Sequence, residues 1–476
     1  MKYPLFFALI LPVLFLVSCN RNPTEPEARV SREAYTITVS ALHRDSIEFS
    51  YTVNGGTRFI LPYHYFDNPL DTPNGVLIRN LSVIDANGSP VDTLCEIRPV
   101  GPIDNRIVIL PGTPAYPVTF RYLLDWSVLQ YDTGYISMPR IHVDESSLFL
   151  IGAYCFIIPE FSTSLLNLWR DNHPVDVTVA APPDLTIYGI PSGTFSCPNL
   201  YNLLFLQLSS GPQPVACGHG GGVDFCFVDL FGFTFAASLV DSMTGMFTAI
   251  LDDIAQSYGS FSGAPYTVSI HNIKGGLEGT YGFAIRNPLY GQRIRLSEIL
   301  AHEALHHFIG IRCGEYEDLW WKEAAATYLG LETAVRLGYF PADQFYARMT
   351  SKFVYADTAR FQRSLADPQL RWELFPQALH SLVYERGAQI MMLLDAAVRT
   401  GSDNRYTLHH VMADLCRRFS GGGFFRSDFI AALERYGADS ASTLFAAYVD
   451  RPDSLPPLNL LDRTFNRLDS LAGFFQ

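Results

Sequence analysis

The periodicity of apolar residues changes near residue 220, and this change constrains the possible folds of the chain more than any other feature. Before it, apolar and polar residues alternate in short segments such as 34–42 and 46–53, which is typical of half-buried β-strands. Turn-forming Asn, Gly, Asp and Pro residues separate these segments. After it, apolar residues recur every three to four positions, and a strand is expected at 266–273. This helical spacing predicts helices at 235–259, 296–309, 318–337, 376–400, 405–419 and 426–436.

Because the strand-like segments precede the helix-like segments along the chain, the sequence predicts an α+β protein with more than one domain. We expect a β-sandwich-like N-terminal domain over residues 33–215 and a mainly helical domain over residues 222–450. A chain of 476 residues is long enough for two or three domains with large cores. The last segment, residues 451–476, begins with several prolines and is expected to be an extended C-terminal tail.

The N-terminus has the pattern of an export signal. The apolar run "LFFALILPVLFLV" at 5–17 is short for a membrane-spanning helix and is interrupted by a proline. It leads into "LVSC", which resembles the lipobox of bacterial lipoproteins. This resemblance implies a signal peptide over residues 1–18 and lipidation of Cys19, and the polar residues 19–32 are then expected to be a tether. An ordinary signal peptide with a chance cysteine is the alternative.

A lipid on Cys19 would make the membrane a partner and would hold the protein at the bacterial cell envelope. Asn20, the next residue, favours the outer membrane by resemblance to enterobacterial sorting, with either a periplasmic or a surface-facing orientation. The formal net charge of −13 argues against a nucleic-acid partner, because phosphate binding requires a basic surface.

The segment "CGHGGGVDFC", Cys217–Cys226, is the densest group of potential thiol and imidazole ligands. An exported protein can form disulfides, so these two cysteines could close a small loop. With His219 they could instead form a metal site, but the spacing matches no known structural zinc motif. We expect a loop or an interdomain linker here.

The helical half contains a motif with the composition of a catalytic zinc site. In "HEALH", His302 and His306 share one helix face because they are four residues apart. Glu323 lies on the following helix, and an antiparallel helix pair would return its carboxylate to the histidines. Catalytic zinc takes three protein ligands and leaves one position for water, so we expect one zinc ion here. Glu303, beside the ligands, is expected to be the general base. The alternative is that His302 and His306 are a histidine pair packed near a core and that Glu323 is a solvated helix carboxylate. His307, about 100° around the helix from His306, is expected to be structural.

This motif, followed by "LWWKEAAATY", resembles the gluzincin metallopeptidases, a clan of zinc enzymes with a thermolysin-like catalytic domain. "GGLEG" at Gly275–Gly279 resembles the clan's segment whose glutamate binds the free α-amino group of the substrate. This resemblance implies substrate-binding roles for Glu278, Gly275 and Gly276. "YERGA", which begins at Tyr384, resembles the clan's "YEKGA", and this likeness implies that the tyrosine stabilises the tetrahedral intermediate.

The segment after Tyr384 resembles the glycyl aminopeptidase family more closely than aminopeptidase N. The resemblance covers residues 40–450 and is strongest over 270–450. Two positions depart from the family pattern. Ala324 replaces the usual glycine after the third ligand, and Gly279 stands where the family often has histidine. The second departure leaves the substrate preference open.

Together these features predict a zinc-dependent aminopeptidase that removes N-terminal residues from peptides or proteins. A zinc-activated water would attack, with Glu303 as general base and Tyr384 as donor to the oxyanion. The fixed negative charge of Glu278 would select a protonated N-terminus. Two alternatives remain open: a zinc endopeptidase on the same scaffold, and a non-catalytic envelope lipoprotein that retains the fold for binding.

Overall fold

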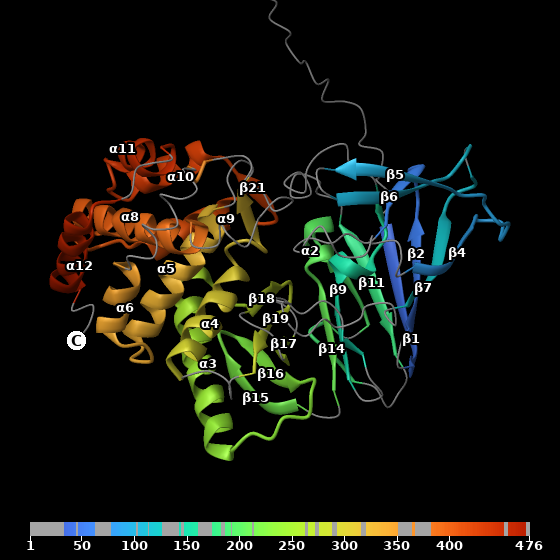
Figure 1. The fold of residues 1–476 in the computed structure, drawn as a ribbon, viewed down its shortest axis with the longest axis horizontal. Coiled ribbons are helices and arrows are strands. Elements are labelled where there is room, and N and C mark those ends of the chain that lie inside the picture. Colours follow the sequence, from blue (N-terminus) through green and yellow to red (C-terminus); the bar gives the residue numbers. More distant parts are fainter. Residues whose placement is uncertain are drawn as a thin grey trace, which may run out of the picture. The chain divides into compact units, whose positions relative to one another are not determined.

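A computed structural model describes most of the chain from residue 33 onwards. The described residues are 33–43, 46–61, 78–100, 103–112, 114–125, 142–143, 147–159, 174–181, 186–191, 193–211, 214–261, 265–271, 276–287, 293–315, 320–350, 364–366, 382–451 and 456–472. The expected signal peptide, Cys19, the tether and Gly275 lie outside the described residues. The described part has the expected α+β architecture, with a strand-rich N-terminal half and a mainly helical C-terminal half (Figure 1).

Among the described residues, the N-terminal half forms three sheets. Their strand orders are β13-β11-β1-β2-β7-β4, β10-β3-β6-β5 and β12-β14-β9-β8. The elements are β1 Glu33–His43, β2 Ser46–Val53, β3 Arg58–Ile60, β4 Ile78–Ile84, β5 Leu94–Val100, β6 Ile103–Ile109, β7 Val118–Asp125, β8 His142–Val143, β9 Leu148–Ile151, α1 Gly152–Cys155, β10 Ile158–Pro159, β11 Val175–Ala180, β12 Ile187–Tyr188, β13 Thr194–Cys197, α2 Leu200–Leu204 and β14 Gln207–Ser210.

The alternation in the sequence explains how these strands pack. On β2, Ile47, Phe49, Tyr51 and Val53 are buried, whereas the residues between them are exposed or half-buried. Because successive side chains of a strand point to opposite faces, this pattern buries one face of the sheet. The ring of Tyr51 stacks on that of Tyr35 from the neighbouring strand, with centroids 3.9 Å apart. The strands predicted at 34–42 and 46–53 are therefore confirmed.

A five-stranded sheet, in the order β15-β16-β17-β19-β18, opens the second half. Its strands are β15 Pro214–Gly220, β16 Val223–Asp229, β17 Tyr266–His271, β18 Gly276–Gly279 and β19 Gly282–Arg286. Every residue of β17 is buried, as expected for an inner strand with both faces covered. Strand β18 lies at one edge and pairs antiparallel with β19. This edge strand contains Glu278 and faces the helix that contains the HEALH motif.

The expectation of a loop or interdomain linker at Cys217–Cys226 was wrong, because this segment is a β-hairpin, whereas the possibility that its two cysteines close a small loop is confirmed. Cys217 on β15 pairs directly with Cys226 on β16, and a disulfide joins them. The bond removes both thiols as metal ligands. His219 instead pairs with Asp224 on the exposed part of the hairpin, at 2.8 Å. The segment therefore serves as an edge of the five-stranded sheet.

The remaining elements are mainly helical. They are α3 Ala237–Tyr258, α4 Arg293–His306, β20 Cys313–Glu315, α5 Trp320–Arg336, α6 Ala342–Met349, the π-helix η7 Leu382–Arg386, α8 Gly387–Gly401, α9 Leu408–Arg418, β21 Gly422–Phe424, α10 Arg426–Arg435, α11 Ala441–Leu444, the π-helix η8 Phe445–Val449 and α12 Leu458–Ala472. The predicted helices agree with α3, α4, α5, α9 and α10 to within three residues at each end. The first residues of the helix predicted at 376–400 lie outside the described ranges, and the rest form η7 and α8.

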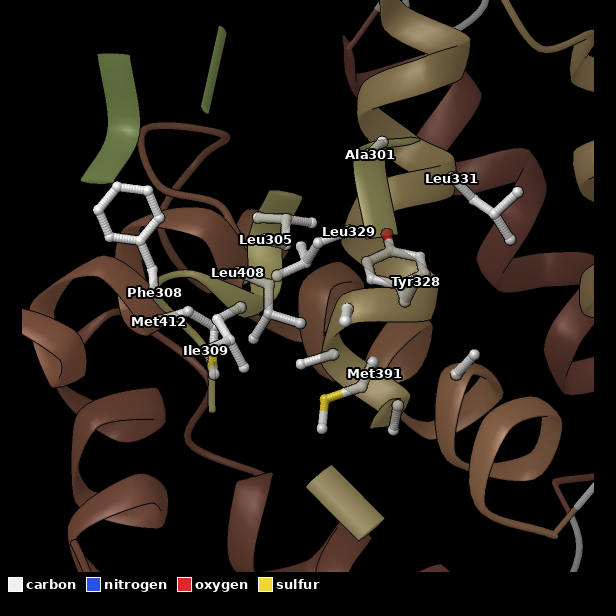
Figure 2. Close-up of a cluster of buried hydrophobic side chains, with 14 of the residues drawn as sticks. Ala301, Leu305, Phe308, Ile309, Tyr328, Leu329, Leu331, Met391, Leu408 and Met412 are labelled. Carbon is white, nitrogen blue, oxygen red and sulfur yellow. The ribbon is translucent and has the colours of Figure 1, made fainter. Parts of the chain in front are cut away.

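An apolar core holds α4 and α5 together. Figure 2 shows Leu305 and Phe308 from α4 and its following turn close to Leu408 and Met412 of α9, with Tyr328 of α5 beside them. All of these side chains are buried. Burying a side chain of this size contributes about 1.5–3 kcal/mol, so the cluster positions both helices firmly.

The expectation of an extended C-terminal tail was also wrong. Residues 458–472 form helix α12, and Leu461 and Leu468 are buried in the core of the helical half. Apolar residues in this segment recur at helical spacing directly after Pro457, and a proline before the first turn is compatible with a helix. The Tyr346 hydroxyl also donates a hydrogen bond to Asp462, at 2.7 Å. Within the described part of the chain, no helix combines the length and apolarity needed to cross a membrane.

A buried network of charged groups joins α5 to α8 and α9. Glu332 on α5 accepts hydrogen bonds from Arg399 at 3.3 Å and from His409 at 3.1 Å. Asp395 on α8 accepts from Arg399 at 2.9 Å and from the Tyr328 hydroxyl at 2.8 Å. Each buried charge therefore has a partner of opposite sign or a hydrogen-bond donor, which buried ionised groups require.

This network predicts acid-sensitive stability. Burial alone would raise the pKa of Glu332, but its contacts with His409, Arg336 and Arg399 lower it to about 2. The stabilisation is present above the unfolded-state pKa near 4.5 and is lost as the pH falls towards 2. We expect Glu332 to contribute roughly 3 kcal/mol to the pH dependence over this range. Urea unfolding at several pH values should show that Glu332→Gln removes this contribution, whereas Glu48→Gln, at an exposed position, does not. An unchanged pH dependence in Glu332→Gln would contradict the assignment.

Candidate active site

Three potential metal ligands converge where α4 meets the first turn of α5. The Nε2 atoms of His302 and His306 lie 3.0 Å apart, and Oε2 of Glu323 lies 3.4 Å from the first and 3.3 Å from the second. Tetrahedral zinc ligands about 2.0–2.1 Å from the metal are separated from one another by about 3.3 Å. The three donor atoms are therefore spaced as a tetrahedral zinc site requires. The structure brings together the three residues that the sequence predicted.

The surroundings of these ligands also suit a metal. Nδ1 of His306 lies 3.0 Å from the carbonyl oxygen of Ile309. Because a carbonyl only accepts hydrogen bonds, the proton belongs on Nδ1, and Nε2 keeps a lone pair for the metal. Burial lowers the pKa of His302, which favours its neutral form. Burial would raise the pKa of Glu323, but His306 and Lys322 hold it well below its usual range. The burial of His302, the tautomer of His306 and the ionised carboxylate of Glu323 therefore all suit metal binding.

Glu303 lies beside the ligands but is not one of them. Its side chain packs against β18, where a Cβ at Gly276 would overlap its carboxylate. Oε2 of Glu303 is buried and makes no hydrogen bond within the described residues. Burial raises the pKa of Glu303, and the negative charges of Glu278 and Glu323 raise it further. A buried acceptor without a partner next to a metal site is well placed to take a proton from a water molecule.

Tyr384, on η7, packs beside His302. The two rings are nearly parallel, with centroids 5.9 Å apart. Burial and the nearby Glu323 and Glu278 carboxylates raise the pKa of Tyr384, so its hydroxyl stays protonated. The same hydroxyl hydrogen-bonds to Glu323, which places a donor at the metal site.

The packing of η7 and α8 on α5 leaves room for Ala324, the first of the two positions that differ from the resembling family's motif. A Cβ added to Gly387 would come within 2.6 Å of the Ala324 side chain. Gly387 therefore provides the space that Ala324 fills.

Gly279, the second of these positions, is also closely packed. A Cβ at Gly279 would lie 2.6 Å from the side-chain carbonyl carbon of Gln207. The Nε2 atom of Gln207 donates hydrogen bonds to the backbone oxygens of Leu277 and Glu278, at 3.0 and 2.8 Å. Gln207 thus occupies the space beside β18 and holds the strand that contains Glu278.

Sequence reasoning missed one residue of the site, Lys322. Its ammonium donates a hydrogen bond to Oε1 of Glu278 and lies 3.5 Å from Oε1 of Glu323. Burial would lower the pKa of Lys322, but Glu278, Tyr201 and Glu323 raise it, so the side chain stays charged. The only sequence signal was a lysine directly before the third ligand, in "WWKEAAATY". Its pairing with Glu278, 44 positions away, depends on the fold.

His307, expected to be structural, lies away from these groups. Its ring is buried and packs against Phe261 and Tyr266, with centroids 5.0 and 5.6 Å away. Burial and the nearby Arg312 hold its pKa well below the usual range. This ring therefore contributes to the core under α4.

Comparisons with known proteins agree with this geometry at the level of the fold. No protein-family model matches the chain. The leucyl aminopeptidase of Saccharolobus solfataricus is 26% identical over 172 residues, which is 34% of this chain. The match spans only 20% of that relative's length.

Solved structures match over a much larger part of the chain. An aminopeptidase N family protein from Idiomarina loihiensis has a TM-score of 0.66 at 19% identity, covering 90% of this chain and 78% of its own. An M1 zinc metallopeptidase from Deinococcus radiodurans has a TM-score of 0.56 at 17% identity, covering 90% and 95%. Leukotriene A4 hydrolase from Saccharomyces cerevisiae has a TM-score of 0.57 at 12% identity, covering 90% and 68%. At these identities the likeness shows that the chain has their fold.

The ligand geometry predicts how metal binding responds to substitution. The purified protein is expected to bind one zinc ion, and Glu323→Ala should lower zinc affinity by more than about 100-fold, since even outer-shell changes cost 10- to 100-fold. Glu298→Ala, one turn before His302 on the same helix, is the control and should keep wild-type affinity. Competition with a chelator, followed by elemental analysis, measures both. Full zinc affinity in Glu323→Ala would remove it from the ligand set.

Proposed function

We propose that this protein is a zinc-dependent metallopeptidase, of the aminopeptidase type, that hydrolyses peptides or proteins. The observation that carries the proposal is the convergence of His302, His306 and Glu323 beside the buried, unpartnered carboxylate oxygen of Glu303. The fold shared with M1 zinc metallopeptidases and the partial match to a leucyl aminopeptidase support it. A single zinc ion at these three ligands completes the proposed site.

The side chains account for each step of amide hydrolysis. Zinc, when bound, polarises the scissile carbonyl and lowers the pKa of a water molecule. Glu303 accepts a proton from the attacking water and delivers it to the nitrogen of the leaving amine. Its raised pKa suits a carboxylate that must hold this proton between the two events. Tyr384 keeps its proton and donates a hydrogen bond to the oxygen that gains negative charge.

The position of Glu278 supports an aminopeptidase, because its carboxylate lies next to the catalytic groups. One oxygen of Glu278 lies within 4.8 Å of potential ligand atoms of Glu303 and His306. A protonated N-terminus could reach this carboxylate while its first peptide bond lay over the metal site. Gly276, which leaves room for Glu303 on the same strand, is part of the proposed substrate-binding edge, as is Gly275, for which the resemblance is the sole support.

An endopeptidase is the second candidate, and one observation favours it: Lys322 already forms an ion pair with Glu278. A non-catalytic binding role would need neither the unpartnered Glu303 oxygen nor the Tyr384 donor, so it explains less of the site.

Attachment to the cell envelope is a further part of the proposal and rests on the sequence alone. The pattern before Cys19 supports lipidation and retention of the protein at a bacterial membrane, with the outer membrane favoured by Asn20. The acidic balance of the chain supports a function without nucleic acid.

Expression in the presence of radiolabelled palmitate is expected to label the wild-type chain but not Cys19→Ala. Equal labelling of both would contradict the anchor.

The mechanism predicts that Glu303→Gln keeps zinc but lowers kcat/KM by about 10²- to 10⁴-fold, because the amide cannot take the proton.

Tyr384→Phe should lower kcat by about 10²- to 10³-fold with little change in KM, because the lost hydrogen bond forms mainly in the transition state. Hydrolysis of a peptide library followed by mass spectrometry measures both effects. Glu298→Gln serves as the control. Wild-type turnover in Glu303→Gln would remove the general-base role.

A further inference from the structure

The amine-binding carboxylate of the proposed peptidase already has a cationic partner from its own chain. Lys322 is 3% exposed and Glu278 is 6% exposed, so this ion pair is buried in the site. The lysine is the residue directly before the third ligand, on the first turn of α5. An ammonium group at this place has the same charge and the same donors as the protonated N-terminus of a peptide. The two cations therefore compete for one carboxylate.

The surrounding structure is built to hold the lysine there. Its aliphatic stem passes over Gly310, where φ is 115° and a Cβ would come within 2.5 Å of Cε. Its ammonium lies 5.4 Å from the centroid of the Phe205 ring, and the Tyr201 hydroxyl forms a hydrogen bond with it. Both aromatic residues come from the strand-rich half of the chain, at α2. Contacts from three separate segments thus define one position for the Lys322 ammonium.

The formal charges of the site also indicate a weakened attraction for a substrate ammonium group. Three carboxylates meet here, those of Glu278, Glu303 and Glu323, and Lys322 offsets one of them. If all three are ionised, the remaining formal charge of minus two is matched by one divalent zinc ion. Among the described side chains, no net negative charge is then left to attract the N-terminal ammonium of a substrate.

We propose that Lys322 is a specificity-determining residue that neutralises Glu278 and reduces the selection for a free α-amino group. The substrates then include peptides whose amino end has no positive charge near the site, namely N-blocked peptides and internal segments of longer chains. This inference rests on the proposed peptidase function and assigns its substrate class. Lys322 acts through Glu278 and takes no part in the bond-breaking step.

The test compares tri-alanine with N-acetyl-tri-alanine, in turnover and in binding. The wild-type, zinc-loaded protein is expected to hydrolyse both with kcat/KM values within about 10-fold of each other. Lys322→Met should raise the ratio of free to blocked kcat/KM by about 10-fold or more, mainly through a lower KM for the free peptide. Glu278→Gln, which leaves Lys322 charged, should lower that ratio by a similar factor. The double variant Lys322→Met/Glu278→Gln should return towards the wild-type ratio.

The set of variants keeps the test decisive even if one variant does not fold. Lys322→Met leaves a buried carboxylate without its partner, which can destabilise the protein, whereas the double variant removes both charges together. Glu278→Gln alone tests the opposite sign of the effect, so the proposal remains open to refutation if Lys322→Met is insoluble. A wild-type ratio above about 1,000, or a ratio that none of the variants changes, would overturn the role of Lys322.

Binding separates this inference from the proposed function. Dissociation constants for the two peptides are measured calorimetrically in the zinc-loaded Glu303→Gln background, with and without Lys322→Met. If Lys322→Met increases the affinity for tri-alanine but not for N-acetyl-tri-alanine, the Lys322 proposal is supported. This holds even if the wild-type protein shows no turnover, a result that would contradict only the peptidase function. Equal affinities with and without Lys322→Met, including no binding in either, overturn the Lys322 proposal and leave the peptidase function to the Glu303 experiment.

Discussion

The close packing of helix α4 against helix α5 is the constraint on which the rest of the site depends. A Cβ at Gly330 would lie 2.9 Å from the backbone nitrogen of His302, so only glycine allows the helices to approach this closely. At this distance the first turn of α5 brings Glu323 to the two histidines of α4. A metal site needs its ligand atoms within a few tenths of an ångström of their ideal separation. The apolar cluster of Figure 2 provides the rigidity that such a separation requires.

Buried charged groups occur in two places in the helical half, the network around Glu332 and Asp395 and the candidate active site, and their effects differ. Around Glu332 and Asp395, carboxylates and arginines satisfy one another, which makes that network structural. At the site, the Oε2 atom of Glu303 is buried without a hydrogen bond in the described residues, and its pKa rises. The same low-polarity surroundings thus stabilise a paired group and activate an unpaired one.

The two halves of the chain meet at strand β18. Gln207, from the strand-rich half, donates to two backbone oxygens of β18, and the Thr280 hydroxyl at the end of this strand donates to the oxygen of Asn202 at 2.6 Å. Phe205 lies against the Lys322 ammonium. The N-terminal sheets therefore contribute to the geometry of Glu278, although none of the predicted catalytic residues comes from them.

Local patterns in the sequence determined the α+β class and most helix boundaries, because helical spacing is readable over a few turns. Short motifs also predicted His302, Glu303, His306 and Glu323 as site residues, and the resemblance of a further motif added Tyr384. The same reasoning failed where the outcome depended on distant partners. The hairpin at 217–226 needed the five-stranded sheet, and helix α12 needed a core on which to bury its leucines. The pairing of Lys322 with Glu278 was likewise decided only by the tertiary structure. A buried charge is stable only beside a partner, and the fold alone brings together partners that are 44 residues apart in the chain.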